Sequence, residues 1–344
     1  MSMNINRRVL VVERPRYIVP TANCFQLDNS AVPAISDGQL RLRTLWLSLD
    51  VMLYARVKRI SSDAEPVALG DVMVGPTVGR VEESNNPAYK VGELLSGFWG
   101  WQDYGVSDGS RVRKLDFCSG HPSQALSAYG ASAFGAYVAL HELAPPKSGE
   151  SVVVGTATGG LGQIAGQIAK LKGCRVVGIA GGAEKCRIAV DLLGFDACVD
   201  HRSSDFAGKL RTACSQGIDV FVDTIGGKAL DAVMPLLNRN ARIAACGLMD
   251  TPRIGEPVYS GKYQYSMSLL NELINRRLQL RGLVVFDHIR QYAAAFHRDM
   301  QAWLAAGSVK PLEEVVNGLE NAPEAFQGLF EGRNLGKLLI KVAD

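Results

Sequence analysis

The sequence predicts an α/β protein in which a doubly wound parallel sheet is joined to a second domain rich in β-strands. From about residue 126 to 308, short continuous apolar strands alternate with helices, which is typical of a parallel sheet covered on both faces. Up to residue 125, strand patterns are interrupted by glycine and proline and helical periodicity is weak, which indicates a partly open barrel. Right-handed crossovers between the alternating strands give the doubly wound order.

The length of the chain also favours two domains. A chain of 344 residues exceeds what one hydrophobic core usually organises. We expect residues 1–125 to form the first, substrate-binding domain and residues 126–308 the second. Residues 309–344 end in the apolar strand KLLIKV, and we assign them back to the first domain.

Each element of the second domain follows from its local pattern. Helix 163–173, for example, places Ile164, Ile168 and Leu171 on one face. Strands are expected at 151–155, 175–181, 196–201, 219–227, 241–247 and 280–286. Helices are expected at 130–143, 163–173, 183–194, 205–215, 228–237 and 289–306. In the first domain, strands are expected within 7–13, 39–49, 71–84, 94–106 and 337–342.

Composition and charge exclude several classes of protein. Hydrophobic residues make up 47% of the chain and charged residues 21%, as in an ordinary globular enzyme. The net charge is +3 and no long basic run is present, so nucleic acid and anionic membranes are not expected partners. Apolar stretches are no longer than strands, and the first residues do not resemble a signal peptide, so we expect a cytoplasmic protein.

The cysteines and histidines do not form a metal-binding pattern. Seven cysteines are scattered without a CxxC pair, which is typical of reduced cytosolic thiols. Between Cys24 and Cys118 the chain contains neither cysteine nor histidine, and the five histidines lack metal spacing. We therefore expect no metal.

The most informative motif is the segment GTATGGLGQIAGQIAKLKGCRVVG at 155–178. It follows an apolar strand and begins an amphipathic helix, where glycines let the backbone approach a diphosphate and the helix directs free N–H groups at it. A purely structural turn would not explain the strand, loop, helix and second strand in this order. The sequence thus predicts a dinucleotide-binding (Rossmann) loop, with Thr156, Gly159, Gly160, Leu161 and Gly162 in contact with the cofactor.

The end of the second strand favours NADPH over NADH. NAD sites usually place an acidic residue there, whereas this strand ends in Ala180-Gly181-Gly182. Lys185 and the pair His201-Arg202 provide cations for a ribose 2′-phosphate. Glu184 is the opposing observation, because an acid at this position is able to face a ribose hydroxyl.

Several segments along almost the whole chain resemble one enzyme family. The chain is similar to the medium-chain dehydrogenase/reductase superfamily, and within it to the zinc-independent branch of prostaglandin reductases, leukotriene B4 12-hydroxydehydrogenases and curcumin-reductase-like enzymes. The matching segments are Asn6-Arg7-Arg8 with Arg14-Pro15, Ser48-Leu49-Asp50, GDVMVGPTVGRV (70–81), residues 99–104, residues 156–174, Gly226-Gly227, Cys246-Gly247 and NAPEAFQGLFEGRNLGKLLIKV (321–342).

The resemblance implies a GroES-like first domain and NADPH-dependent reduction of a carbon–carbon double bond conjugated to a ketone or aldehyde. It assigns Lys185 and His201 to the 2′-phosphate and Asn334 to the nicotinamide end of the cofactor. Gly181, Arg202, Cys246 and Gly247 are also expected to contact the cofactor.

The catalytic residue is not identified by the resemblance. The family usually carries a tyrosine shortly after the segment that matches Cys246-Gly247, and this chain has Pro252 near that position. The reaction needs a proton donor for the enolate, and a tyrosine hydroxyl or water serves this purpose. The candidate tyrosines are Tyr54, Tyr259, Tyr263 and Tyr265.

Two other functions remain open from the sequence. Quinone reduction with NADPH uses the same fold and needs no protonated carbon. A cofactor-binding protein with little activity is the alternative from another class, because the differences from the family cluster near the nicotinamide. We further expect a homodimer formed through the apolar segment LRGLVVF at 280–286.

Overall fold

The computed structural model describes residues 5–15, 19–58, 65–115, 121–247 and 264–344, without the side chains of residues 264–268. The chain separates into two compact units. Unit 1 comprises residues 1–127 and 313–344, and unit 2 comprises residues 128–312. The boundaries expected from the sequence differ from these by a few residues.

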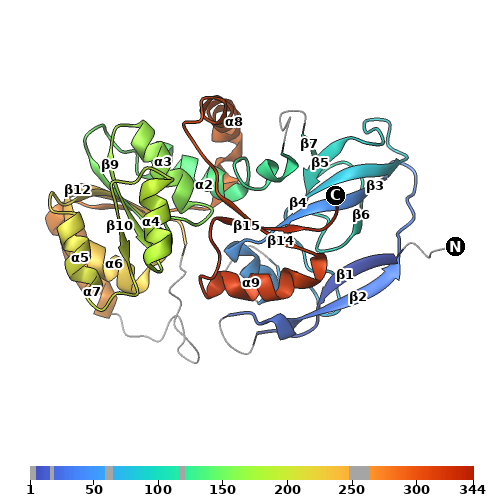
Figure 1. Cartoon of the computed structure of the whole chain (residues 1–344), viewed down its shortest axis with the longest axis horizontal. Coiled ribbons are helices and arrows are strands. Elements are labelled where there is room, and N and C mark those ends of the chain that lie inside the picture. The colour runs from blue at the N-terminus through green and yellow to red at the C-terminus, as the bar shows by residue number, and fades with distance from the viewer. Residues whose placement is uncertain (1–4, 16–18, 59–64, 116–120, 248–263) are drawn as a thin grey trace. The chain divides into compact units, whose positions relative to one another are not determined.

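Unit 1 contains a seven-stranded sheet with a separate pair of strands (Figure 1). The pair consists of antiparallel β1 (Ile5–Val11) and β2 (Phe25–Ala31). The helices of this unit include α1 (Tyr54–Val57) and α9 (Ala322–Phe330). The sheet has the order β14 (Glu313–Asn317), β15 (Lys337–Lys341), β3 (Leu40–Ser48), β4 (Thr77–Ser84), β5 (Leu94–Gly97) and β7 (Arg113–Lys114), and β6 (Tyr104–Ser107) also pairs with β3.

A buried ion pair ties β15 to the segment that follows β3. The Lys337 ammonium binds the carboxylate of Asp50 and donates to the Leu49 carbonyl at 3.0 Å. The Ser48 hydroxyl donates to the same carboxylate at 2.6 Å. Lys337 and Asp50 are both buried. Removing one partner of such a pair leaves an uncompensated charge and costs about 3–5 kcal/mol, so the pair holds the C-terminal strand in this sheet.

An aromatic cluster fills the core of unit 1. The ring of Phe25 stacks on Trp101 with centroids 5.4 Å apart, and Phe326 of α9 meets both rings edge-on. Trp101 and Phe326 are fully buried. Helix α9 therefore completes the core that the N-terminal segments begin.

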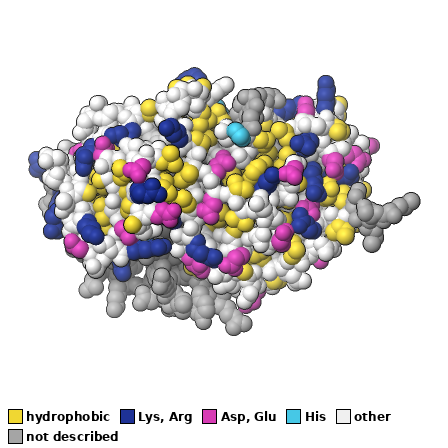
Figure 2. All heavy atoms as spheres, in the orientation of Figure 1, with side chains coloured by type: hydrophobic (Ala, Val, Ile, Leu, Met, Phe, Trp, Pro, Cys, Tyr) yellow, Lys and Arg dark blue, Asp and Glu magenta, His cyan; other side chains and the backbone are white. Residues whose placement is uncertain are grey.

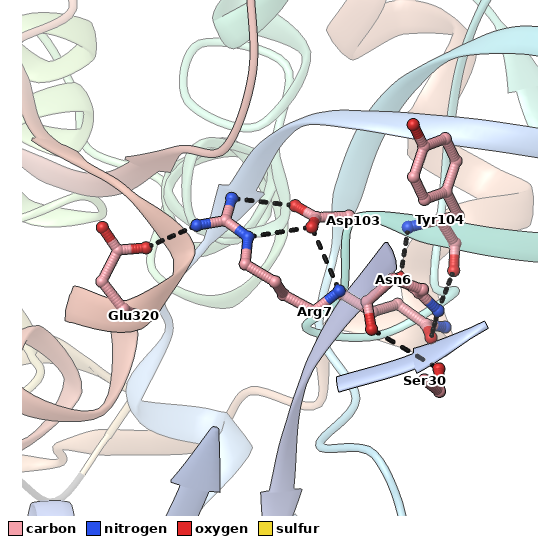
Figure 3. Close-up of polar contacts among 7 residues, drawn as sticks. Asn6, Arg7, Ser30, Asp103, Tyr104 and Glu320 are labelled. Atoms are coloured by element: carbon pink, nitrogen blue, oxygen red, sulfur yellow. Dashed lines mark hydrogen bonds and ion pairs between the residues drawn. The ribbon is translucent and has the colours of Figure 1, made fainter. Parts of the chain in front are cut away.

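Two of the segments that carry the family resemblance bind each other (Figure 3). Arg7 forms a two-pronged ion pair with Asp103, at 2.9 and 3.1 Å, and a further ion pair with Glu320 at 2.9 Å. Its hydrogen bond to Asp103 raises the pKa of the guanidinium. The Asn6 side chain accepts from the backbone N–H of Tyr104 at 2.9 Å and donates to the carbonyl of the same residue at 3.3 Å. These motif residues stabilise unit 1.

Unit 2 is a six-stranded parallel sheet between two layers of helices (Figure 1). The sheet has the order β10 (Ala197–Asp200), β9 (Arg175–Ala180), β8 (Ser151–Val154), β11 (Ile218–Asp223), β12 (Leu237–Ala245) and β13 (Gln279–Gly282). One face is covered by α2 (Ala131–Val138), α3 (Gly162–Leu171) and α4 (Ala183–Asp191). The other is covered by α5 (Phe206–Ala213), α6 (Gly227–Val233) and α7 (Gln264–Arg276), and α8 (Ile289–Ala305) follows β13.

The sequence-based strand at 280–286 is partly wrong. Strand β13 ends at Gly282, and residues Val285–His288 form a 3₁₀ turn. The partner strand β12 ends at Ala245, and among the described residues the pairing stops with the hydrogen bond from the Leu283 N–H to the Ala245 carbonyl. Strands β2, β7 and β14 and helices α1, α7 and α9 were not predicted.

The surface of the described residues carries mixed charge. On the face shown in Figure 2, acidic and basic side chains are interspersed among apolar side chains. Among the described helices, none combines the length and the apolar character needed to cross a lipid bilayer.

Candidate functional site

The turn between β8 and α3 is built around the carbonyl of Thr156. This carbonyl accepts the N–H of Gly159 at 2.7 Å, and Thr156 itself has a φ of 43°, in the left-handed region. A Cβ atom added to Gly162 would lie 2.2 Å from the same oxygen. Glycine at this position is therefore what allows α3 to begin so close to the end of β8.

The backbone of this turn presents free donors. The N–H groups of Gly160 and Leu161 donate to no described residue, whereas Gln163 and Ala165 already bond backward to Gly159 and Leu161. Both unbonded groups lie at the N-terminus of α3, where the helix dipole favours negative charge. The turn thus has the donors and the open backbone that a diphosphate requires.

The carboxyl ends of neighbouring strands meet at this turn. The hydroxyls of Thr156 and Thr224 are 2.8 Å apart, and the N–H of Cys246 donates to the Asp223 carbonyl at 2.7 Å. A Cβ added to Gly247 would be 3.2 Å from the Thr224 carbonyl. The structure therefore gathers the ends of β8, β11 and β12. Burial raises the pKa of the Cys246 thiol to about 12, so this thiol stays protonated at neutral pH.

A second group of candidate cofactor-binding residues lies at the ends of β9 and β10. A Cβ added to Gly181 would lie 2.9 Å from Nε2 of His201 and 3.1 Å from Nε of Arg202, so both side chains lie directly against this glycine. Lys185 follows in the first turn of α4. We name the residues Gly181, Lys185, His201 and Arg202 the basic corner. It is the kind of site that binds a phosphate monoester.

Asp200 organises the basic corner and was not identified from the sequence. Its Oδ1 accepts the N–H of Gly182 at 2.8 Å and that of Arg202 at 2.9 Å. Partial burial raises the pKa of this carboxyl, but the two backbone hydrogen bonds and the nearby cations outweigh it and lower the pKa overall. Its place at the end of a parallel strand was the available indication, since such ends meet at one edge of the sheet.

Asn334 lies in unit 1, in the turn between α9 and β15. Its side chain donates to the Gly336 carbonyl at 2.9 Å. It lines a pocket of about 270 Å³ within unit 1, together with Glu314, Glu324 and Arg333. Its expected contact with the nicotinamide stays a prediction.

The candidate catalytic tyrosines are only partly described. Tyr259 and Tyr263 lie outside the described residues, and Tyr265 belongs to α7 but its side chain is not described. Tyr54 in α1 packs edge-on against Phe330 with ring centroids 6.1 Å apart. Burial raises the pKa of its hydroxyl, which keeps it protonated and able to donate.

Histidine, cysteine and carboxylate side chains do not gather into a metal-binding group. In the parts of the chain that the structure describes, no three of them are placed to hold one ion.

The fold and the turn after β8 define the class of protein, an oxidoreductase with a Rossmann domain. Residues 7–115 match a family described as the N-terminal domain of oxidoreductase, and residues 160–300 match the family of zinc-binding dehydrogenases. Unit 2 is the Rossmann domain and unit 1 the GroES-like domain of this architecture.

Relatives with curated names define the branch. The NADPH-dependent curcumin reductase of Escherichia coli is 43% identical over 98% of this chain and 97% of its own length. Prostaglandin reductase 1 of Rattus norvegicus is 33% identical over 94% and 95% of the two chains. The crystal structure of CurA in complex with NADPH from Vibrio vulnificus is 44% identical, covers 98% of this chain and 99% of its own, and superposes with a TM-score of 0.91. The chain therefore belongs to the zinc-independent branch of the medium-chain dehydrogenase/reductase superfamily.

The first prediction concerns Gly162. The substitution Gly162→Ala forces a Cβ atom against the Thr156 carbonyl, and we expect it to lower the free energy of unfolding by about 1–3 kcal/mol. Urea denaturation measures this change. Gly282→Ala in β13 is the matched control, because nothing lies within 4 Å of the added atom. Equal stability of the two variants would contradict the role of the close approach.

Proposed function

We propose that this chain is an NADPH-dependent reductase of the carbon–carbon double bond of α,β-unsaturated ketones or aldehydes. One observation carries the proposal: the chain is 43% identical, over almost its full length, to an NADPH-dependent curcumin reductase. A relative named 2-alkenal reductase (NADP(+)-dependent), from Nicotiana tabacum, is 34% identical over 88% of this chain.

The described residues of unit 2 fit a phosphorylated dinucleotide. The N–H groups of Gly160 and Leu161 would bind the diphosphate, and Gly162 leaves the backbone open for it. The basic corner would bind the ribose 2′-phosphate. Asp200 would position the corner by holding the backbone of Gly182 and Arg202. When bound, NADPH supplies the hydride that reduces the β-carbon of the substrate.

The protein must also stabilise the negative charge that develops on the substrate carbonyl oxygen. A protonated hydroxyl placed at that oxygen lowers the barrier, and a proton must then reach the α-carbon. The Tyr54 hydroxyl is protonated at neutral pH, and burial raises its pKa, so it is a hydrogen-bond donor but a weaker acid than an exposed tyrosine. Tyr259, Tyr263 and Tyr265 remain candidates on the sequence alone.

The second prediction tests the reaction. The purified protein should oxidise NADPH in the presence of enones such as curcumin or a 2-alkenal. The loss of absorbance of the reduced cofactor measures this oxidation. A Tyr→Phe substitution at each of the four candidates should lower kcat about 10²-fold or more at the true donor only.

Two results would overturn this assignment. Turnover of quinones without turnover of enones would make the protein a quinone reductase. Tight NADPH binding without turnover of either class would make it a cofactor-binding protein.

The third prediction tests cofactor choice. Lys185→Ala should raise the Kd for NADPH about tenfold and leave the Kd for NADH almost unchanged, because one charge-assisted hydrogen bond to the 2′-phosphate is lost. Fluorescence titration with both cofactors measures the two constants. Glu184→Ala is the matched control in the same turn. If Glu184→Ala weakens the binding of NADH while Lys185→Ala weakens the binding of both cofactors equally, the basic corner does not bind a 2′-phosphate.

The fourth prediction concerns assembly. We propose a homodimer in the cytoplasm, where the six described cysteines, all free, would stay reduced. Strand β13 is the last strand of its sheet among the described residues, and Leu280, Val284 and Phe286 near it are exposed. Light scattering should give twice the chain mass of 37.0 kDa, and Phe286→Glu should shift it to the monomer. A monomeric wild type would reject this interface, and cell fractionation tests the location.

A further inference from the structure

Two buried glutamines of α3 hold the chain at the point where it leaves unit 2. Gln163 and Gln167 lie one turn apart on α3 and are only 1% and 5% exposed. The Gln163 amide accepts the N–H of Leu312 at 2.6 Å and donates to the carbonyl of the same residue at 2.8 Å. The Gln167 amide binds Lys310 in the same way, accepting at 2.7 Å and donating at 3.2 Å. We name these four residues the glutamine clamp.

Helix and strand geometry explain why two glutamines fit this segment. Four residues of a helix rise about 6.0 Å and two residues of an extended chain about 6.6 Å, so the two side chains match alternate residues of an extended segment. Pro311 lies between the two clamped residues, has no N–H to satisfy and keeps Lys310 out of the helical region. Strand β14 begins only at Glu313, so the two amides take the place of a neighbouring strand for residues 310–312.

The clamp begins at the turn that presents donors for a diphosphate. Gln163 directly follows Gly162, and its own N–H donates to the Gly159 carbonyl at 3.1 Å. The same residue therefore belongs to the first turn of α3 and holds Leu312 with its side chain. Buried polar groups are costly to leave unbonded, so the clamped segment must follow the first turn of α3.

A second set of contacts continues from the clamp into unit 1. Leu312 is the last residue of unit 2, and Glu313 is the first residue of β14. The next residue, Glu314, accepts the backbone N–H of Leu335, which is the neighbour of Asn334. Each of these hydrogen bonds lies within one unit, and the peptide bond between residues 312 and 313 connects them. A continuous path therefore runs from the diphosphate turn to the residue beside Asn334.

We propose that Gln163 and Gln167 are positioning residues of the reductase, which couple the turn that binds the diphosphate to the placement of Asn334. This inference rests on the proposed function, in which Asn334 contacts the nicotinamide end of the cofactor. The clamp holds the segment that leads into β14, and Glu314 holds the turn that carries Asn334. The basic corner, at the ends of β9 and β10, is not part of this path. Loss of the clamp therefore weakens the binding of the nicotinamide end of NADPH and spares the adenosine end.

The fifth prediction tests the path in the whole protein without cofactor. Gln163→Met keeps the length of a buried side chain but removes both hydrogen bonds to Leu312. We expect amide hydrogen exchange, measured by mass spectrometry, to become about tenfold faster at Leu312 and at Leu335, because local opening then breaks fewer hydrogen bonds. Gln167→Met, which removes only the bonds to the preceding part of the segment, should also accelerate exchange at Leu335.

The matched control for exchange is Asn238→Ala. The Asn238 side chain donates to Asp219 at 2.8 Å, near the starts of β12 and β11, which is the opposite end of the sheet from the clamp. This variant loses a side-chain hydrogen bond of unit 2 and should leave exchange at Leu335 unchanged. Unchanged exchange at Leu335 in both clamp variants, or equal acceleration in Asn238→Ala, overturns the proposal.

The effect on the cofactor is measured with two ligands. Isothermal titration calorimetry compares NADPH with 2′-phospho-ADP-ribose, which is the same molecule without the nicotinamide. Gln163→Met should raise the Kd for NADPH about tenfold, the value of about one hydrogen bond, and leave the Kd for the fragment almost unchanged. A merely structural role would weaken both ligands equally, and that result, or no loss for either, overturns the coupling.

The two experiments separate this inference from the proposed function. Hydrogen exchange is measured without cofactor, so it reports the path whether or not the protein binds NADPH. Faster exchange at Leu335 in a clamp variant of a protein that binds neither ligand would support the path and reject the proposed function. A wild type that binds both ligands, with clamp variants that bind them as the wild type does, would keep the proposed function and reject the coupling.

Discussion

The constraint on which the site in unit 2 depends is the close approach of α3 to the end of β8. No side chain fits between Gly162 and the Thr156 carbonyl, so the helix starts almost directly at the edge of the sheet. Its N-terminal donors consequently face the same edge to which β9, β11 and β12 bring Gly181, Thr224 and Cys246. The other features of the site depend on this geometry, because parallel strands all end at one edge.

Local patterns were sufficient to predict the alternating elements of unit 2. Strands such as β8 and β11 are buried on both faces and therefore read as continuous apolar runs, and α3 repeats its apolar residues with helical spacing. Where pairing decides the structure, local patterns were insufficient. Residues 284–286 are as apolar as a strand, but the described pairing with β12 ends where the Leu283 N–H donates to the Ala245 carbonyl. Strand β2 contains alternating polar residues, and its sequence pattern did not predict a strand. Its pairing with β1 is what identifies it as one.

The same distinction applies to the site. The residues from Thr156 to Gly162 are contiguous, so they could be predicted from the sequence. The basic residues of the corner come only a few positions after the ends of β9 and β10 in the sequence, so they could be predicted as well. The role of Asp200 depends on the spatial approach of two loops, and the contact of Thr156 with Thr224 joins strands that are distant in the chain.

The placement of β15 between β14 and β3 has a consequence for how the protein is made. Residues 128–312 form a continuous segment, so this unit can fold as soon as it leaves the ribosome. The other unit begins the chain but has to wait for Phe326 and Lys337, which are synthesised last. Until then the nascent chain exposes Trp101 and the charge of Asp50, which is the situation in which chaperones protect an unfinished domain.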